Sequence, residues 1–206
     1  DRSKGPLLVI VIGLALFAFI AGDAWKVLQP HQSQDVGEVN GETISAQDFQ
    51  ALVEEYTEVV KFSSGLNALS DEQTNQIKDE VWRAYVNNKL IENEAEKLGL
   101  TVSKAELQAI IDAGVHPMLQ QTPFRNPQTG AFDKDMLKKF LVDYSKMNKA
   151  QMPAQYAEYY NSMYNFWSFV EKSLIQARLQ EKYQALITKS LFSNPVEAED
   201  AFNARV

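Results

Sequence analysis

The sequence predicts a mainly α-helical protein with an N-terminal transmembrane helix and one small β-hairpin. Three observations support this fold class. Residues 5–22 form an apolar run without a charged side chain. Most of the remaining chain repeats apolar residues at helical spacing behind Ser-led start signals. Only one short stretch, around Asn40-Gly41, combines strand-forming residues with a turn dipeptide.

The apolar run at residues 5–22 is expected to be an uncleaved membrane anchor. Its 18 residues span roughly 27 Å at about 1.5 Å per residue, close to the thickness of the hydrocarbon core. Arg2 and Lys4 precede the run, and the positive-inside rule keeps this basic end in the cytoplasm. A cleaved signal peptide is the alternative, but Ile20 and Asp23 make poor cleavage sites. We divide the chain into an anchor at 1–25, a linker at 26–35 and an exported domain at 36–206.

The hairpin is expected directly after the linker. Val36, Val39 and Ile44 are strand formers, and Asn40-Gly41 suits a type I′ turn, whose two central residues need a positive φ. An isolated two-stranded hairpin is only marginally stable in water. We therefore expect its partner strands to lie after residue 206 or in another chain.

Five helices are predicted from start and stop signals together with apolar periodicity. Ser45, Ser70 and Ser103 each begin a capping-box pattern, and Gly65 and Gly99 stand where helices should end. The predicted helices cover residues 46–62, 71–98, 104–113, 133–147 and 154–191.

Two further segments carry proline signals. Residues 117–131 contain three prolines and one glycine, which predicts a loop rather than a helix. Asn194-Pro195 supplies an N-cap and a first-turn proline for one more helix.

Composition and charge exclude several classes of function. The net charge is −7, with 27 acidic and 20 basic side chains, and without a basic stripe this disfavours nucleic acid as a partner. The chain has no cysteine, which excludes thiol nucleophiles and disulfides. Its two histidines, His31 and His116, are expected to be surface or loop residues rather than ligands. We predict no catalytic residue, no metal and no cofactor in this chain.

The most unusual stretch of the sequence is the aromatic segment from Tyr156 to Phe169. Seven aromatic residues and a methionine cover more of the helix circumference than a core-facing stripe does. One interpretation is a helix packed on two sides. The other is an exposed patch that binds apolar segments of other proteins, because aromatic and Met side chains adapt to varied partners. The candidate binding residues are Tyr156, Tyr160, Met163, Tyr164, Phe166, Trp167 and Phe169.

Residues Met118, Leu119 and Phe124 bear on the same question. They lie in the predicted loop and could extend the patch, but an ordinary connection that packs these side chains inward is the expectation.

Three motifs resemble the SurA-like N-terminal domain family, found in SurA, PrsA and PpiD. The stretch VGEVNGETISAQDFQ is similar to its entry motif, in which a V-N-G turn leads to I-S/T, an acidic residue and an aromatic. The stretch YVNNKLIENEAEKLGLTVSKAELQAII is similar to its second signature, a helix ending in E-A-x-x-L-G-L before one that opens on V-S. The stretch FRNPQTGAFDKDMLKKFL is similar to its G-x-F-D segment. The matching residues are Val39, Asn40, Gly41, Ile44, Ser45, Asp48, Phe49, Glu94, Ala95, Leu98, Gly99, Leu100, Val102, Ser103, Phe124, Gly130, Phe132 and Asp133.

This resemblance implies a periplasmic chaperone or foldase whose helical domain binds unfolded, newly exported polypeptides without ATP. With the predicted anchor it looks like PpiD-like proteins, which cross the Gram-negative inner membrane once, with the N-terminus in the cytoplasm and the bulk in the periplasm. Such relatives often carry parvulin-type prolyl isomerase domains. Here such a domain, and the closing parts of the chaperone core, would follow residue 206. The expected partners are client polypeptides and the membrane, through residues 5–22.

A second hypothesis belongs to a different class of function. The chain would be a structural or adaptor subunit of an inner-membrane complex such as the Sec translocon. The anchor would dock it there, and the aromatic helix would form a fixed interface.

Overall fold

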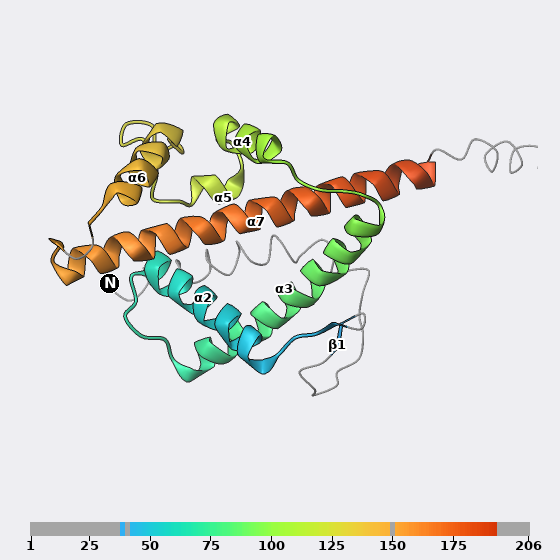
Figure 1. Cartoon of the computed structure of the whole chain (residues 1–206), viewed down its shortest axis with the longest axis horizontal. Helices are drawn as coiled ribbons and strands as arrows, with labels where there is room; N and C mark the ends of the chain where they lie inside the picture. Colours follow the sequence, from blue (N-terminus) through green and yellow to red (C-terminus); the bar gives the residue numbers. More distant parts are fainter. Residues whose placement is uncertain (1–37, 40–41, 149–150, 193–206) are drawn as a thin grey trace, which may run out of the picture.

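One long helix organises the protein (Figure 1). The computed structural model describes residues 38–39, 42–148 and 151–192. Helix α7, Ala154–Phe192, has 39 residues and is about 58 Å long at about 1.5 Å per residue. Helices α2 and α3 lie on one side of it, and α4, α5 and α6 lie on the other.

The mainly helical fold class is confirmed. All five predicted helices are present, and their ends fall within two residues of the predicted ends. The elements before α7 are β1 Glu38–Val39, β2 Glu42–Thr43, α2 Ala46–Ser64, α3 Asp71–Lys97, α4 Lys104–Ala113, α5 Pro117–Gln120 and α6 Lys134–Lys146.

The hairpin is present as a short antiparallel pair. Glu38 pairs with Thr43 and Val39 pairs with Glu42, so each strand has two residues. Strand β1 lies against α3, and the side chain of Ile44, just after β2, is buried. The turn dipeptide and the predicted partner strands lie outside the described residues.

The helix starts follow the predicted capping chemistry. Ser70 and Ser103 form complete capping boxes, in which the serine hydroxyl accepts from the third residue of the helix, Gln73 or Glu106, and that side chain accepts from the serine backbone N–H. At Ser45 the hydroxyl accepts from the N–H of residue 48 at 3.0 Å. These bonds satisfy N–H groups that a helix start leaves without partners.

The end of α3 also follows its sequence signal. Gly99 has a φ of 67°, and the Leu100 N–H donates to the carbonyl of Ala95 at 2.8 Å. This arrangement is a Schellman motif, which favours glycine because of the positive φ.

The prediction of a loop over residues 117–131 is wrong for its first four residues. Pro117 begins the short helix α5, where its fixed φ suits the first turn, and His116 caps that helix. Met118 and Leu119 are 1% and 0% exposed. Burial of these two side chains therefore stabilises a turn that the proline content alone argues against.

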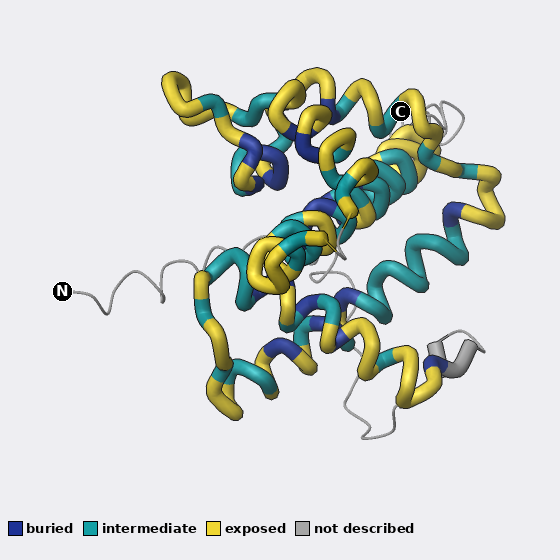
Figure 2. The backbone as a smooth tube through the Cα atoms, turned by 60° about the vertical axis from the view of Figure 1, so that its left-hand side comes forward, coloured by how far each residue is buried: buried dark blue, intermediate teal, exposed yellow. Residues whose placement is uncertain are grey.

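The hydrophobic core follows α7 along its length. Figure 2 shows that buried residues gather where the other helices face α7. Helices α2 and α3 contribute Val53, Tyr56, Val59, Val60, Ile77 and Val81; residues 104–140 contribute Ile111, Met118, Leu119, Phe124, Leu137 and Phe140; and α7 contributes Phe166, Trp167, Val170 and Leu174.

Among the described residues, no helix is long and apolar enough to cross a membrane. The predicted anchor at 5–22, the linker at 26–35 and the helix expected after Asn194-Pro195 all lie outside the described residues.

Candidate functional site

The seven candidate residues of the aromatic segment all lie in the first half of α7, where the structure separates them by exposure. Phe166 and Trp167 are each 3% exposed and belong to the core. Tyr156 and Tyr164 remain 55% and 37% exposed. The half-buried members are Tyr160, Met163 and Phe169.

On one side of α7, aromatic rings pack against α2. The centroid of the Phe62 ring lies 5.4 Å from that of Phe166 and 6.0 Å from that of Tyr159. The Tyr56 and Phe169 rings are 5.5 Å apart. These separations fall in the range where aromatic pairs contribute beyond their buried area.

On the other side, rings of α7 pack against α6 and the segment before it. The pairs are Phe124 with Trp167 at 6.1 Å, Phe140 with Tyr160 at 6.2 Å and Tyr144 with Tyr164 at 4.3 Å between ring centroids. The Tyr144 hydroxyl also donates to the Asn161 side-chain oxygen at 2.8 Å. Packing on two sides explains why the aromatic residues spread so widely around the helix.

Residues Met118, Leu119 and Phe124 face inward, as the simpler interpretation expected. Phe124 is 3% exposed, and the other two are more deeply buried. None of the three adds to a surface patch in this conformation.

Three tyrosines of α7 keep accessible rings, and we call Tyr156, Tyr159 and Tyr164 the exposed tyrosines. Tyr159 is 52% exposed and was absent from the predicted set. Its place three residues after Tyr156 in the same aromatic run is the signal that could have included it. A tyrosine ring offers apolar contact area and a polar hydroxyl, which suits partners of varied sequence.

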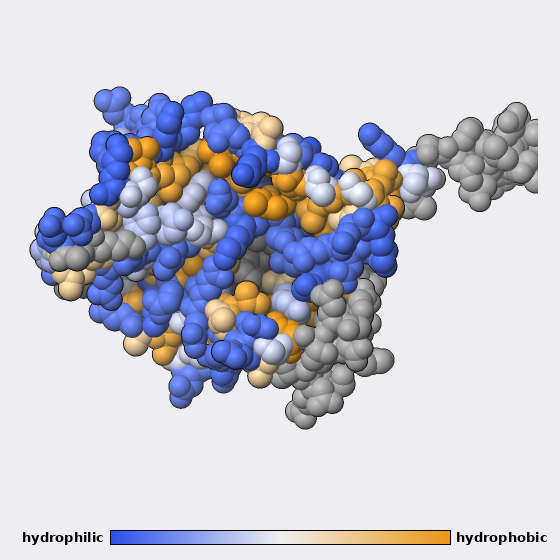
Figure 3. Space-filling view, viewed as in Figure 1, coloured by the Kyte–Doolittle hydropathy of each residue, from blue (hydrophilic) through white to orange (hydrophobic). Residues whose placement is uncertain are grey.

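Apolar side chains lie on the surface of the domain along α7. In the space-filling view they lie between the charged surfaces of the helices on either side (Figure 3). Toward the C-terminal end of α7, Leu186 and Ile187 are 39% and 38% exposed. The helix therefore presents accessible apolar groups well beyond its aromatic segment.

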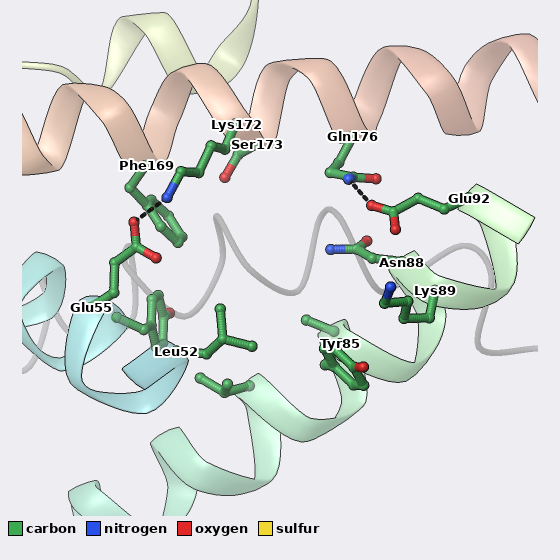
Figure 4. A pocket seen from close by; sticks show the side chains of 13 residues that line it. Leu52, Glu55, Tyr85, Asn88, Lys89, Glu92, Phe169, Lys172, Ser173 and Gln176 are labelled. Carbon is green, nitrogen blue, oxygen red and sulfur yellow. Dashed lines mark hydrogen bonds and ion pairs between the residues drawn. The ribbon is translucent and has the colours of Figure 1, made fainter. Parts of the chain in front are cut away.

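A groove of about 310 Å³ opens between α2, α3 and α7 (Figure 4). At one end of it the Lys172 ammonium donates to Glu55 at 2.7 Å. At the other end the Gln176 amide donates to the carboxylate of Glu92. These polar pairs join α7 to both helices across the groove. The apolar lining residues are Leu52, Tyr56, Val81, Ala84, Tyr85 and Phe169.

Sequence reasoning missed this groove. The lining residues of α2 and α3 follow the helical spacing of a core-facing stripe. This spacing does not predict that α2, α3 and α7 diverge and leave a groove. Ala84 is the one local signal, because its small side chain leaves room between its larger neighbours.

Burial also changes the ionisation of Tyr56, which lines the groove, and of Glu80 of α3. Burial raises the pKa of the Tyr56 phenol, and the negative charge of Glu80 raises it further. Burial raises the pKa of Glu80 as well, and nearby Arg83 partly opposes that shift. Tyr56 therefore stays neutral at physiological pH and acts as an apolar and hydrogen-bonding group.

A second cavity, of about 370 Å³, lies between α4 and α7 and is lined by His116. Beside it Glu106 accepts from Lys182 at 3.0 Å, and Arg178 lies 3.5 Å from the same carboxylate. The hydrogen bond from the Ser103 backbone and the bond from Lys182 lower the pKa of Glu106 to about 2. Glu106 thus remains ionised over the whole physiological range.

Within the described part of the chain, no three His, Asp or Glu side chains gather in a way that could hold a metal ion. The arrangement is suited to non-covalent binding, through apolar surface, tyrosine hydroxyls and paired charges at the groove.

Comparison with known proteins gives one match. The model of the SurA-like N-terminal domain family matches residues 1–141, which include α2 to α5 and the first part of α6. No curated protein and no solved structure matches the chain significantly. The match covers more than half of the 206 residues. The chain therefore belongs to the SurA-like N-terminal domain family, a family of the periplasmic chaperone type.

Proposed function

We propose that this chain is the client-binding part of a membrane-anchored periplasmic folding factor of the PpiD type, and that it binds unfolded, newly exported polypeptides without ATP. Family membership supports a chaperone role. The observation that carries the proposal is that one domain presents two accessible features, the exposed tyrosines of α7 and the apolar groove between α2, α3 and α7. Large aromatic area at low entropic cost is what binding of varied apolar segments requires.

The seven predicted residues take three roles in this proposal. Tyr156 and Tyr164 contact clients directly, together with Tyr159. The buried rings of Phe166 and Trp167 fix the position of α7, so that the accessible rings stay in place. The half-buried members are Tyr160, Met163 and Phe169. They lie at the edge between the core and the surface, where their side chains can adjust their positions.

The cellular setting is part of the same proposal. An anchor at residues 5–22 would hold the domain on the periplasmic side of the inner membrane. A parvulin-type isomerase domain following residue 206 would supply the enzymatic activity of the full protein. The family membership and the apolar run in the sequence support these two points.

Site-specific photocrosslinking in the living cell tests the proposal. A photoreactive residue at Tyr159 or Tyr164 should capture a range of newly exported chains. The same residue at Phe166, which is 3% exposed on the same helix, should capture few. A further control at Lys139, whose side chain is 78% exposed on α6, should also stay near background. Capture at Lys139 with silence at both tyrosines would reject the assignment of the client surface.

The adaptor hypothesis predicts a different pattern in the same experiment. One membrane protein would be captured at a fixed stoichiometry, and the purified chain would not suppress aggregation of unfolded proteins. A broad set of captured clients argues for the chaperone role.

A further inference from the structure

The short helix α5 fastens one half of the domain to α7. We call residues 104–146, which form α4, α5 and α6, the α4–α6 lobe. The side chains of Met118 and Leu119 are 1% and 0% exposed, and α5 contacts α7 directly. Its attachment adds to the α6 rings that pack on Tyr160 and Tyr164 and to the ion pair of Glu106 with Lys182, which also hold the lobe on α7.

The stability of α5 depends on His116. A helix of four residues makes few bonds of its own, so its capping group carries more weight than in a long helix. The His116 backbone is extended, with φ −62° and ψ 134°, and its Nδ1 accepts from the Met118 N–H at 3.3 Å. An accepting Nδ1 must be unprotonated, so the cap exists only in the neutral imidazole.

The surroundings of His116 favour that neutral form. The imidazole is half-buried, and burial lowers its pKa below the ordinary 6.5, while Glu181 partly opposes this shift. The charged groups that line the cavity with it are Glu106 of α4 and Arg178 and Glu181 of α7. Both carboxylates already have cationic partners: Glu181 lies 3.1 Å from Arg178, and Glu106 is held by Lys182.

We propose that His116 is a proton-operated latch: when the imidazole takes up a proton, the cap on α5 is lost and α5 opens away from α7 more often. Protonated Nδ1 is a donor, and it then faces the Met118 N–H, which is also a donor. The latch is closed while His116 is neutral and opens as the pH falls through the pKa of His116.

Opening would change what α7 displays. Trp167 and Leu174 are α7 residues that are 3% and 1% exposed, and they belong to the same core as Met118 and Leu119. Opening of α5 would expose Met118 and Leu119 and the part of this core that they cover. That they would then bind clients rests on the proposed function, whereas the opening itself does not.

Hydrogen exchange in the full chain tests the latch. Amide protection is measured at about pH 7.5 and about pH 5, above and below the ordinary pKa of imidazole. The rates are corrected for the intrinsic pH dependence of exchange. We expect residues 115–122 to lose about fivefold or more of their protection at the lower pH, the size of effect that follows loss of a cap. Glu106 does not titrate in this window, because its pKa is about 2.

The matched control is His116→Asn. Asparagine caps helices well and does not titrate, so this variant should keep its protection at both pH values. Equal loss in the variant and the natural chain would overturn the proposal, as would unchanged protection in the natural chain. A change confined to α3 would point to Glu80 instead, and would also overturn it.

A second measurement leaves His116 itself unchanged. The chain has two histidines, and the ring resonances of His116 are assigned by comparison with His31→Gln. The amides of α5 should shift with the same midpoint as the His116 ring. Separate midpoints would overturn the latch. Client capture at Tyr159 and Tyr164 is scored at neutral pH, so failure of the latch and failure of the proposed function are told apart.

Discussion

The two sides of α7 are built differently. On one side, α2 and α3 have 19 and 27 residues and contact α7 over much of its length. On the other side, α4, α5 and α6 have only 10, 4 and 13 residues, although residues 104–146 contribute as many buried side chains to the core as α2 and α3 do. Rings of α6 that pack on Tyr160 and Tyr164, together with partly exposed ion pairs at Glu106, complete the attachment.

This difference predicts unequal local stability. Burial spread along long helices is lost only when the whole domain unfolds. A lobe of short helices, joined to α7 in part by exposed ion pairs that contribute little in water, can open at a lower free energy. The core is thus one continuous cluster in space, but we expect its two sides to open separately.

The largest effect should come from loss of a buried ring of α7. Trp167→Ala removes a side chain that packs against Phe124 at 6.1 Å and is 3% exposed. We expect a loss of roughly 3–5 kcal/mol in the free energy of unfolding. Tyr156→Ala on the same helix should change it by less than about 0.5 kcal/mol. Denaturant titration followed by circular dichroism measures both, and similar losses in the two variants would contradict the assigned burial.

A matched pair of core substitutions sharpens the comparison. Met118→Ala and Ile77→Ala each remove a large buried side chain, 1% and 3% exposed, at a cost of about 2–5 kcal/mol. In hydrogen exchange, Met118→Ala should accelerate amides only in the α4–α6 lobe, whereas Ile77→Ala should accelerate them throughout. Uniform acceleration in both variants would mean that the two sides open together.

Loss of a helix cap should have a smaller effect, limited to the lobe. Ser103→Ala removes the hydroxyl that accepts from the Glu106 N–H at 3.1 Å, and we expect a loss of about 1 kcal/mol. The amides of α4 should exchange faster, and those of α2 should not. Ser145→Ala, in an exposed serine that donates to Val142 at 2.8 Å, is the control and should be near neutral.

The smallest effect concerns Glu80 and depends on pH. Burial raises the pKa of this carboxyl in the folded state, so the folded state favours the protonated form, and stability is lost as the pH rises through that pKa. Glu80→Gln should therefore stabilise the α2–α3 side at neutral pH, by less than about 1 kcal/mol because the group is half-exposed and screened. The gain should disappear once wild-type Glu80 is protonated. A gain that is equal at every pH would contradict this origin, and thermal denaturation across pH measures it.

Local signals in the sequence were sufficient for much of the fold. Ser70, Ser103 and Gly99 mark helix ends because capping and positive φ depend on a few neighbouring residues. Helix α5 could not be predicted in the same way, since its four residues are stabilised by the burial of Met118 and Leu119 against distant elements. Three helices have to be assembled before that burial, or the groove, exists.

The candidate surface was predictable only in outline. The aromatic run in α7 indicated a helix with two apolar sides, but exposure of Tyr156 and burial of Phe166 depend on where α2 and α6 pack. The family resemblance, found through motifs between Val39 and Asp133, is confirmed by the match to residues 1–141. Helix α7 lies beyond that match, so its role stays a proposal based on its own geometry.

The most direct test of the central claim measures aggregation. An unfolded, aggregation-prone protein is diluted into buffer with the full chain, or with the triple variant Tyr156→Ser, Tyr159→Ser and Tyr164→Ser. The control replaces three other exposed apolar residues, Leu98, Met136 and Val142, which are 49%, 40% and 42% exposed outside α7. We predict that the natural chain and the control suppress aggregation and that the tyrosine variant, still folded, loses most of this activity. Equal suppression by all three would contradict the claim that the exposed tyrosines of α7 bind clients.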